Sequence, residues 1–138
     1  MKRYQSQSVN KDYKHSDITG DIIGCAMRVH SGLGPGYPEV IYQRAMAHEM
    51  GKASLSFSRE INIPVMYDGV QVGIRRADFI VKNTVVLELK AISEMDKGNF
   101  NQVLNYLEAY KKEIGLLINF GTESLQFKRL ILTRNKNT

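Results

Sequence analysis

The sequence lacks the features that mark membrane, secreted and disulfide-stabilised proteins. Its longest apolar runs, such as Val85 to Leu87 and Leu116 to Ile118, are far too short to span a bilayer. The N-terminal residues are polar and hold no apolar stretch typical of a secretory signal. A single cysteine, Cys25, excludes an internal disulfide, and its apolar helical neighbours predict a buried side chain in a reducing compartment. We therefore expect a cytoplasmic protein with no membrane partner.

Several common catalytic motifs are missing as well. The sequence contains no Walker loop, no dinucleotide fingerprint and no Ser/His/Asp order typical of a hydrolytic triad. His15 and His48 have no partners at the spacing of a metal site, and no Cys/His cluster favours zinc. Any metal site in this chain is therefore expected to be built from carboxylates.

The 138 residues correspond to one ordinary domain, with 43% hydrophobic and 24% charged residues. The net charge of +5 is concentrated at the two ends of the chain. We expect a flexible basic arm at 1–15, a single domain at 16–132 and a basic tail at 133–138. Basic ends suit contacts with phosphate groups, but solvated, disordered termini explain the same charges.

Hydrophobic spacing predicts three helices. The first begins near Ser16 or Asp17, either of which can cap it, and ends before the glycine-rich turn at 31–36. The second begins near Pro38 and ends at Gly51, and the third covers about 96–111.

Alternating residues predict strands at 57–67, 70–81, 84–92, 114–120 and 125–132, with Asp68-Gly69 as the turn of a hairpin. Three consecutive strands, a crossover helix and further strands predict an α/β (α+β) fold, with a mixed central sheet flanked by helices.

Charged residues interrupt the most apolar of these strands. Glu88 and Lys90 alternate with Leu87 and Leu89, so both charged side chains project from one face of the sheet. Burying a charge is unfavourable unless it is paired or binds a metal. The pattern indicates either a functional site that includes Asp78 on the preceding strand, or a structural Glu88–Lys90 ion pair on a wet sheet face.

The strand register decides whether the two acids meet. A two-residue turn between the strands would place Asp78 opposite Leu87, with the acids on opposite faces. A three-residue connection at 82–84, or an equivalent bulge, instead places Asp78 opposite Glu88, with Cβ atoms about 5 Å apart. We predict the second register. Two adjacent carboxylates repel each other, and a hard cation such as Mg²⁺ or Mn²⁺ relieves that repulsion.

Other residues offer weaker evidence of function. Glu39 falls in the first turn of its helix, where the helix dipole alone accounts for an acid, and Tyr42 shares its face. Gln102 and Tyr106 share a face of the third helix and either turn toward Lys90 or form a solvated rim. His30 either approaches Glu39 or bonds backbone carbonyls at its helix end. Glu39 and Gln102 are candidate site residues, and His30 and Tyr106 are candidates for supporting roles.

The ordered motifs resemble those of the GxxExxY protein family over residues 17–132. The segments that carry the resemblance are His30 to Tyr42, Arg76-Ala77-Asp78, Leu87 to Ala91, Gln102 to Leu107 and Gly115 to Phe120. Two positions depart from expectation. Ala77 stands where the superfamily's name places proline, and Pro38 is an unusual choice inside the GxxExxY element.

That family resembles the PD-(D/E)xK nuclease-like superfamily, which implies a restriction-endonuclease-like αβββαβ core. By this resemblance Asp78, Glu88 and Lys90 fall on the signature residues, Glu39 on the early acid and Gln102 on the later glutamine. The implied activity is Mg²⁺-dependent (or Mn²⁺-dependent) hydrolysis of nucleic-acid phosphodiesters, with Asp78 and Glu88 as metal ligands and Glu39 as a further ligand or water-orienting group. The alternatives are an accessory module that binds nucleic acid or a protein partner without cutting, and a structural homo-oligomer.

Overall fold

The computed structural model describes residues 14–133, so nearly all of the expected basic arm and tail lies outside it. Within 14–133, none of the helices is long and apolar enough to cross a membrane. The elements along the chain are α1 (Ser16–Leu33), α2 (Glu39–Lys52), β1 (Phe57–Arg59), β2 (Asn62–Tyr67), β3 (Val70–Arg76), β4 (Phe79–Val81), β5 (Val85–Lys90), α3 (Lys97–Tyr110), β6 (Ile114–Asn119) and β7 (Gln126–Ile131).

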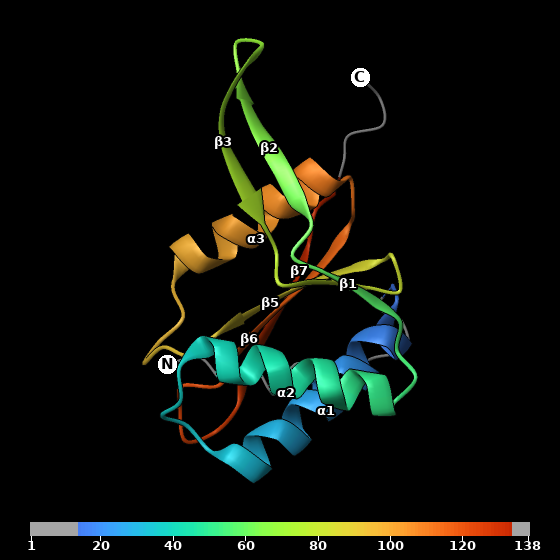
Figure 1. The fold of residues 1–138 in the computed structure, drawn as a ribbon, viewed down its shortest axis with the longest axis vertical. Coiled ribbons are helices and arrows are strands. Elements are labelled where there is room, and N and C mark those ends of the chain that lie inside the picture. The colour runs from blue at the N-terminus through green and yellow to red at the C-terminus, as the bar shows by residue number, and fades with distance from the viewer. Residues whose placement is uncertain (1–13, 134–138) are drawn as a thin grey trace.

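The central sheet has five strands in the order β1-β4-β5-β6-β7. β5 and β6 run parallel because α3 crosses between them, and the other neighbours are antiparallel. Helices α1 and α2 lie below the sheet in Figure 1 and α3 lies on its other side. The predicted mixed sheet flanked by helices is confirmed.

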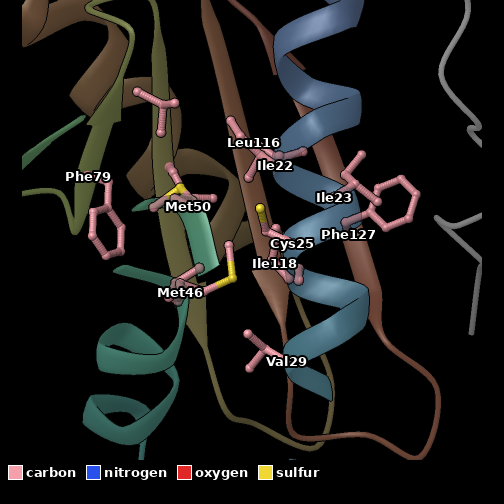
Figure 2. Packing of buried hydrophobic residues seen from close by; sticks show 14 of the residues in the cluster. Ile22, Ile23, Cys25, Val29, Met46, Met50, Phe79, Leu116, Ile118 and Phe127 are labelled. Carbon is pink, nitrogen blue, oxygen red and sulfur yellow. The ribbon is translucent and has the colours of Figure 1, made fainter. Parts of the chain in front are cut away.

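Alternation along the strands divides the core into two layers. The side chains of Leu87, Leu89, Leu116 and Ile118 lie in the core cluster shared with α1 and α2. Figure 2 shows Leu116 and Ile118 beside Ile22 and Cys25 of α1, with Met46 and Met50 of α2 in the same cluster. On the other face, apolar residues of the same strands pack against α3. Cys25 is fully buried, as its neighbours in the sequence predicted. The face under α3 is the one that carries Glu88.

The helix ends follow the sequence closely, with one exception. Pro38 precedes α2 as predicted, and α3 lies within the predicted range of about 96–111. Asp96 caps α3 in a capping box with Asn99, a feature that was not predicted from the sequence. The expected cap of α1 by Ser16 or Asp17 is wrong. His15 precedes α1 in the left-handed region with φ 58°, and no side chain caps the helix.

The two long strands predicted at 57–67 and 70–81 are each divided in two, which corrects that prediction. The start of the first strand (β1) and the end of the second (β4) lie in the sheet, and the parts between them form a separate two-stranded β2–β3 hairpin. Figure 1 shows this hairpin projecting from the sheet beside α3. The chain bends at Glu60, whose φ is 51°, between β1 and β2. The alternating pattern continues through both parts, so periodicity alone cannot reveal the bend.

Tyr110 of α3 fastens the base of the hairpin. Its hydroxyl donates to the Ile61 carbonyl and accepts a hydrogen bond from the Ala77 backbone N–H at 3.2 Å. Ile61 and Ala77 lie where the chain leaves and re-enters the sheet. A proline at position 77 would have no N–H to donate. The alanine that departs from the superfamily's name therefore supplies a specific contact in this chain.

Candidate functional site

The β4–β5 connection has the predicted register. Val81 pairs with Val85 and Phe79 with Leu87, so residues 82–84 form a three-residue connection. Continuing that register by one position brings Asp78 opposite Glu88. The structure therefore confirms the predicted register, and a hydrogen bond from the Asp78 N–H to Glu88 Oε1 joins the two acidic residues.

Hydrogen bonds hold both carboxylates in place. The Asp78 backbone N–H donates to Glu88 Oε1 at 3.1 Å, and the Leu89 N–H donates to Asp78 Oδ2 at 2.7 Å. The Gln43 amide, from α2, donates to Asp78 Oδ1 at 2.8 Å. Each oxygen of an ionised carboxylate has two lone pairs, so these bonds leave acceptor capacity free. The acids are fixed by backbone geometry and still able to bind another group.

Lys90 completes the group at the end of β5. Its Nζ lies 3.7 Å from Glu88 Oε2, and the two side chains are 17% and 6% exposed respectively. The ion pair proposed as the plainer explanation therefore exists, but Glu88 is buried and Lys90 is largely shielded from solvent, so the pair is not on a wet sheet face. One ammonium lies near the carboxyl groups of Asp78 and Glu88, which leaves an excess of negative charge when both are ionised.

Burial and nearby negative charge change the pKa values of these acidic side chains. Burial, followed by repulsion from Asp78, raises the pKa of Glu88 to about 8. Burial also raises the pKa of Asp78, against the opposing effects of the Leu89 N–H and Lys90. Desolvation and the charge of Asp78 raise the pKa of Glu39. The pKa values of Glu39 and Glu88 thus both respond to the charge of Asp78.

Glu39 reaches this spot from α2, and the loop before it is held by Tyr42. The Tyr42 hydroxyl donates to the Gly34 carbonyl at 2.6 Å and accepts from the Tyr37 N–H at 3.2 Å. Its buried ring stacks on Phe120 with centroids 4.6 Å apart. Tyr42 therefore fixes the turn that sets where α2, and with it Glu39, begins.

On the α3 side, Tyr106 and Gln102 border the acids. Tyr106 is 4% exposed and accepts a hydrogen bond from the Gln102 amide at 3.1 Å. Burial and the charge of Glu88 raise the pKa of Tyr106 to about 12. Tyr106 is thus kept as a neutral phenol beside the acid pair. The structure joins Gln102 to Tyr106.

His30 lies elsewhere. Its Nε2 is 2.8 Å from the Thr122 carbonyl, and its ring lies near that of Phe120. This is the bond to a backbone carbonyl that we gave as the alternative to an approach to Glu39. His30 connects α1 to the loop between β6 and β7.

The acid pair fits a hard divalent cation. Its donors are all oxygen, and the pKa values of both carboxyl groups are raised, first by burial, so a bound cation would stabilise their ionised forms. Among residues 14–133, however, no group of three His, Cys, Asp or Glu side chains is placed to hold a metal ion. Glu39 therefore does not join Asp78 and Glu88 in a three-acid cluster. Two carboxylates with water or phosphate completing the shell are a usual arrangement for Mg²⁺.

Sequence reasoning missed two residues that shape the site. Gln43 is four residues after Glu39 on the same helix face, a spacing that could have identified it. Asn119 is fully buried opposite Lys90, and its amide bonds both the N–H and the carbonyl of Ile92 at 3.0 Å. These bonds fix the chain directly after Lys90. Nothing in the local sequence distinguishes Asn119 from a solvated loop residue.

Comparison with known proteins agrees with this geometry. The model of the PD-(D/E)XK nuclease superfamily matches residues 16–130. The structure resembles an alkaline exonuclease from Laribacter hongkongensis (LHK-Exo) with a TM-score of 0.51 and 7% identity, covering 94% of this chain and 76% of that one. A second solved structure, SSO0001, gives a TM-score of 0.47 and 20% identity, covering 97% of this chain and 60% of that one. No curated protein matches the chain. At such identities the likeness to the exonuclease shows the restriction-endonuclease-like fold alone.

Proposed function

Since this chain belongs to the PD-(D/E)XK nuclease superfamily, we propose that it is a Mg²⁺- or Mn²⁺-dependent nuclease that hydrolyses nucleic-acid phosphodiesters. The observation that supports this most is that Asp78 lies opposite Glu88 and donates its N–H to the Glu88 carboxylate, beside the ammonium of Lys90. We further propose that it falls in the GxxExxY group, with Gly36, Glu39 and Tyr42 as the motif residues. The fixed turn before α2 supports this placement.

In the proposed reaction Asp78 and Glu88 hold the cation. When bound, a divalent ion makes a coordinated water more acidic and offsets charge on the phosphate. Hydrolysis forms a bond from a water oxygen to phosphorus and breaks a bond to a sugar oxygen. Lys90 stabilises the negative charge that develops on the phosphate as this happens, because its ammonium is preplaced and largely shielded from solvent.

The remaining residues position these groups. Gln43 and the Leu89 N–H orient Asp78 by occupying one lone pair on each of its oxygens. Glu39, whose pKa is raised by burial and by Asp78, orients a water molecule at the edge of the site. Tyr106, tied to Gln102, closes the α3 side with a neutral hydroxyl.

A cleavage assay with a matched pair of lysine variants tests the proposal. Single- and double-stranded DNA and RNA are incubated with the protein and Mg²⁺, Mn²⁺ or chelator, beside Lys90→Ala and Lys52→Ala. Lys52 is exposed and ends α2 about 20 Å from Glu39. We expect metal-dependent cutting that falls about 100-fold or more in Lys90→Ala and is retained in Lys52→Ala.

Two results would contradict a nuclease. Equal cutting by Lys90→Ala and the parent protein would point to a contaminating enzyme. Salt-sensitive binding of nucleic acid with no cutting under any metal, unchanged in Lys90→Ala, would instead support the non-catalytic binding module.

A further inference from the structure

A groove of about 870 Å³ separates the β2–β3 hairpin from α3. One wall comes from the hairpin and includes Val65, Met66 and Arg75, and the other comes from α3 and includes Asn101, Asn105 and Tyr106. Because Tyr110 binds the base of the hairpin, the separation between the walls is set by the fold. The volume falls in the range of roughly 300–1,000 Å³ typical of ligand sites.

Tyr106 links the groove to the acid pair. It lines the groove, and the charges of Glu88 and Asp78 act on its hydroxyl, as does the charge of Arg75. Gln102 lines the groove and donates to the same hydroxyl. A ligand lying along the groove would therefore reach the position where the proposed reaction takes place.

The two walls differ in chemistry. The α3 wall presents the amides of Asn101, Gln102 and Asn105, which both donate and accept hydrogen bonds. The hairpin wall presents apolar groups, including Val65 and Met66, together with the Arg75 guanidinium. Within residues 14–133 Arg75 forms no ion pair, whereas its neighbour Arg76 pairs with Glu60 at 3.5 Å. An apolar surface, hydrogen-bonding amides and one free cation match unpaired bases joined to a phosphate.

We propose that this groove binds a short single-stranded segment of nucleic acid and directs it to the acid pair. This inference rests on the proposed function. A single strand fits better than a duplex because the groove offers one guanidinium. Duplex binding depends mainly on many phosphate contacts. The bases of a duplex are paired and stacked, so an apolar wall cannot lie against them as it can against unpaired bases.

The hairpin itself presents a competing occupant. Its outer residues Tyr67, Val70, Val72 and Ile74 are 56–74% exposed, and a two-stranded hairpin has two free edges. A second copy of the chain pairing there would cover the hairpin in a dimer and compete with an oligonucleotide for it. The oligonucleotide affinity and the oligomeric state separate these two occupants.

The test measures binding without cutting. Fluorescence anisotropy of labelled oligo(dT), oligo(U) and a duplex of the same length is recorded in chelator over a series of KCl concentrations. Arg75→Ala is compared with Arg76→Ala, the adjacent arginine that faces the other side of the hairpin. Asn105→Asp, which changes an exposed amide to a carboxylate of the same shape, provides a second groove variant.

We expect oligo(dT) or oligo(U) to bind more tightly than the duplex. Arg75→Ala should weaken that binding about tenfold and reduce the slope of log K against log[KCl] by about 0.7, the loss of one phosphate contact. Asn105→Asp should weaken it by a similar factor, and Arg76→Ala should leave both quantities near those of the parent protein. Light scattering should show that the protein bound to the oligonucleotide is monomeric.

Three results would contradict the binding of single strands in the groove. These are tighter binding of the duplex, equal effects of Arg75→Ala and Arg76→Ala, and a dimer that excludes the oligonucleotide. The outcome is independent of the cleavage assay. If the parent protein binds single strands through Arg75 but never cuts them, the proposed nuclease activity is contradicted and the proposed binding in the groove is supported. If Lys90→Ala abolishes cutting while Arg75→Ala changes nothing, the proposed nuclease activity is supported and the proposed binding in the groove is contradicted.

Discussion

Replacing Glu88 with glutamine should stabilise the metal-free protein at alkaline pH. Glu88 is 5% exposed and its pKa is raised to about 8, first by burial and then by the charge of Asp78. The rise in the pKa of Glu88 from its ordinary value of 4.5 to about 8 means that folding disfavours the charged side chain by at most about 5 kcal/mol. Glutamine keeps the oxygen that accepts the Asp78 N–H and removes the charge.

The direction follows from proton binding. Between about pH 4.5 and 8 the folded protein retains the Glu88 proton while the unfolded chain has released it. The free energy of unfolding therefore falls as pH rises, by up to about 1.4 kcal/mol per pH unit, and the loss is complete above about pH 8. Below pH 4.5 both states are protonated and the stabilising contribution is fully present. The pKa of about 8 already includes the attraction of Lys90. Relaxation of the site and water penetration reduce the penalty for the charged form, so we expect a net gain of about 2–3 kcal/mol at pH 9.

Urea unfolding in chelator at pH 5, 7 and 9 measures this effect. Glu88→Gln should match the parent protein near pH 5 and exceed it progressively as pH rises. Glu123→Gln, on the exposed loop before β7, is the matched control and should show no such trend. Adding Mg²⁺ at ten times its dissociation constant should stabilise the parent protein by about 1.4 kcal/mol and leave Glu88→Gln unchanged. A stability difference that is the same at pH 5 and pH 9 would refute the reasoning.

Two further substitutions test how the site is supported. A Cβ at Gly121 would lie 2.4 Å from the backbone N and O of Ile92. Gly121→Ala should therefore lower the free energy of unfolding by about 3 kcal/mol or more, measured by urea unfolding. A loss under 1 kcal/mol would show that the backbone there can move to make room. Tyr42→Phe leaves the Gly34 carbonyl and the Tyr37 N–H without their partner and should cost about 2 kcal/mol, measured by thermal unfolding, whereas an unchanged Tm would show that the turn before α2 does not depend on it.

Much of the site was predictable because its residues violate a simple pattern. Glu88 and Lys90 are charged positions in an apolar strand, and placing Asp78 on the same face required one specific register. Strand alternation and the unfavourable burial of charge were therefore enough to bring the three together. The hairpin was not predictable in the same way. A strand that remains in the sheet and one that leaves it share the period of two, and the bend depends on distant Tyr110.

Residues that support the site through tertiary contacts also could not be identified from the sequence. Asn119 acts by bonding the backbone of Ile92, 27 positions away along the chain, and no local signal marks that partner. Gln43 was recoverable from its spacing to Glu39, but only once Asp78 was known to face α2. Gln102 was expected near Lys90 and is bonded to Tyr106, because the helix face it shares with Tyr106 brings the two side chains together.

A crystal of the protein soaked in Mn²⁺ would examine the acid pair most directly. Anomalous diffraction locates the ion without any assumption about activity. We predict a peak within about 2.5 Å of a carboxylate oxygen of both Asp78 and Glu88, which disappears in Asp78→Asn. No peak at saturating Mn²⁺, or a peak that contacts neither acid, would contradict a cation site between them.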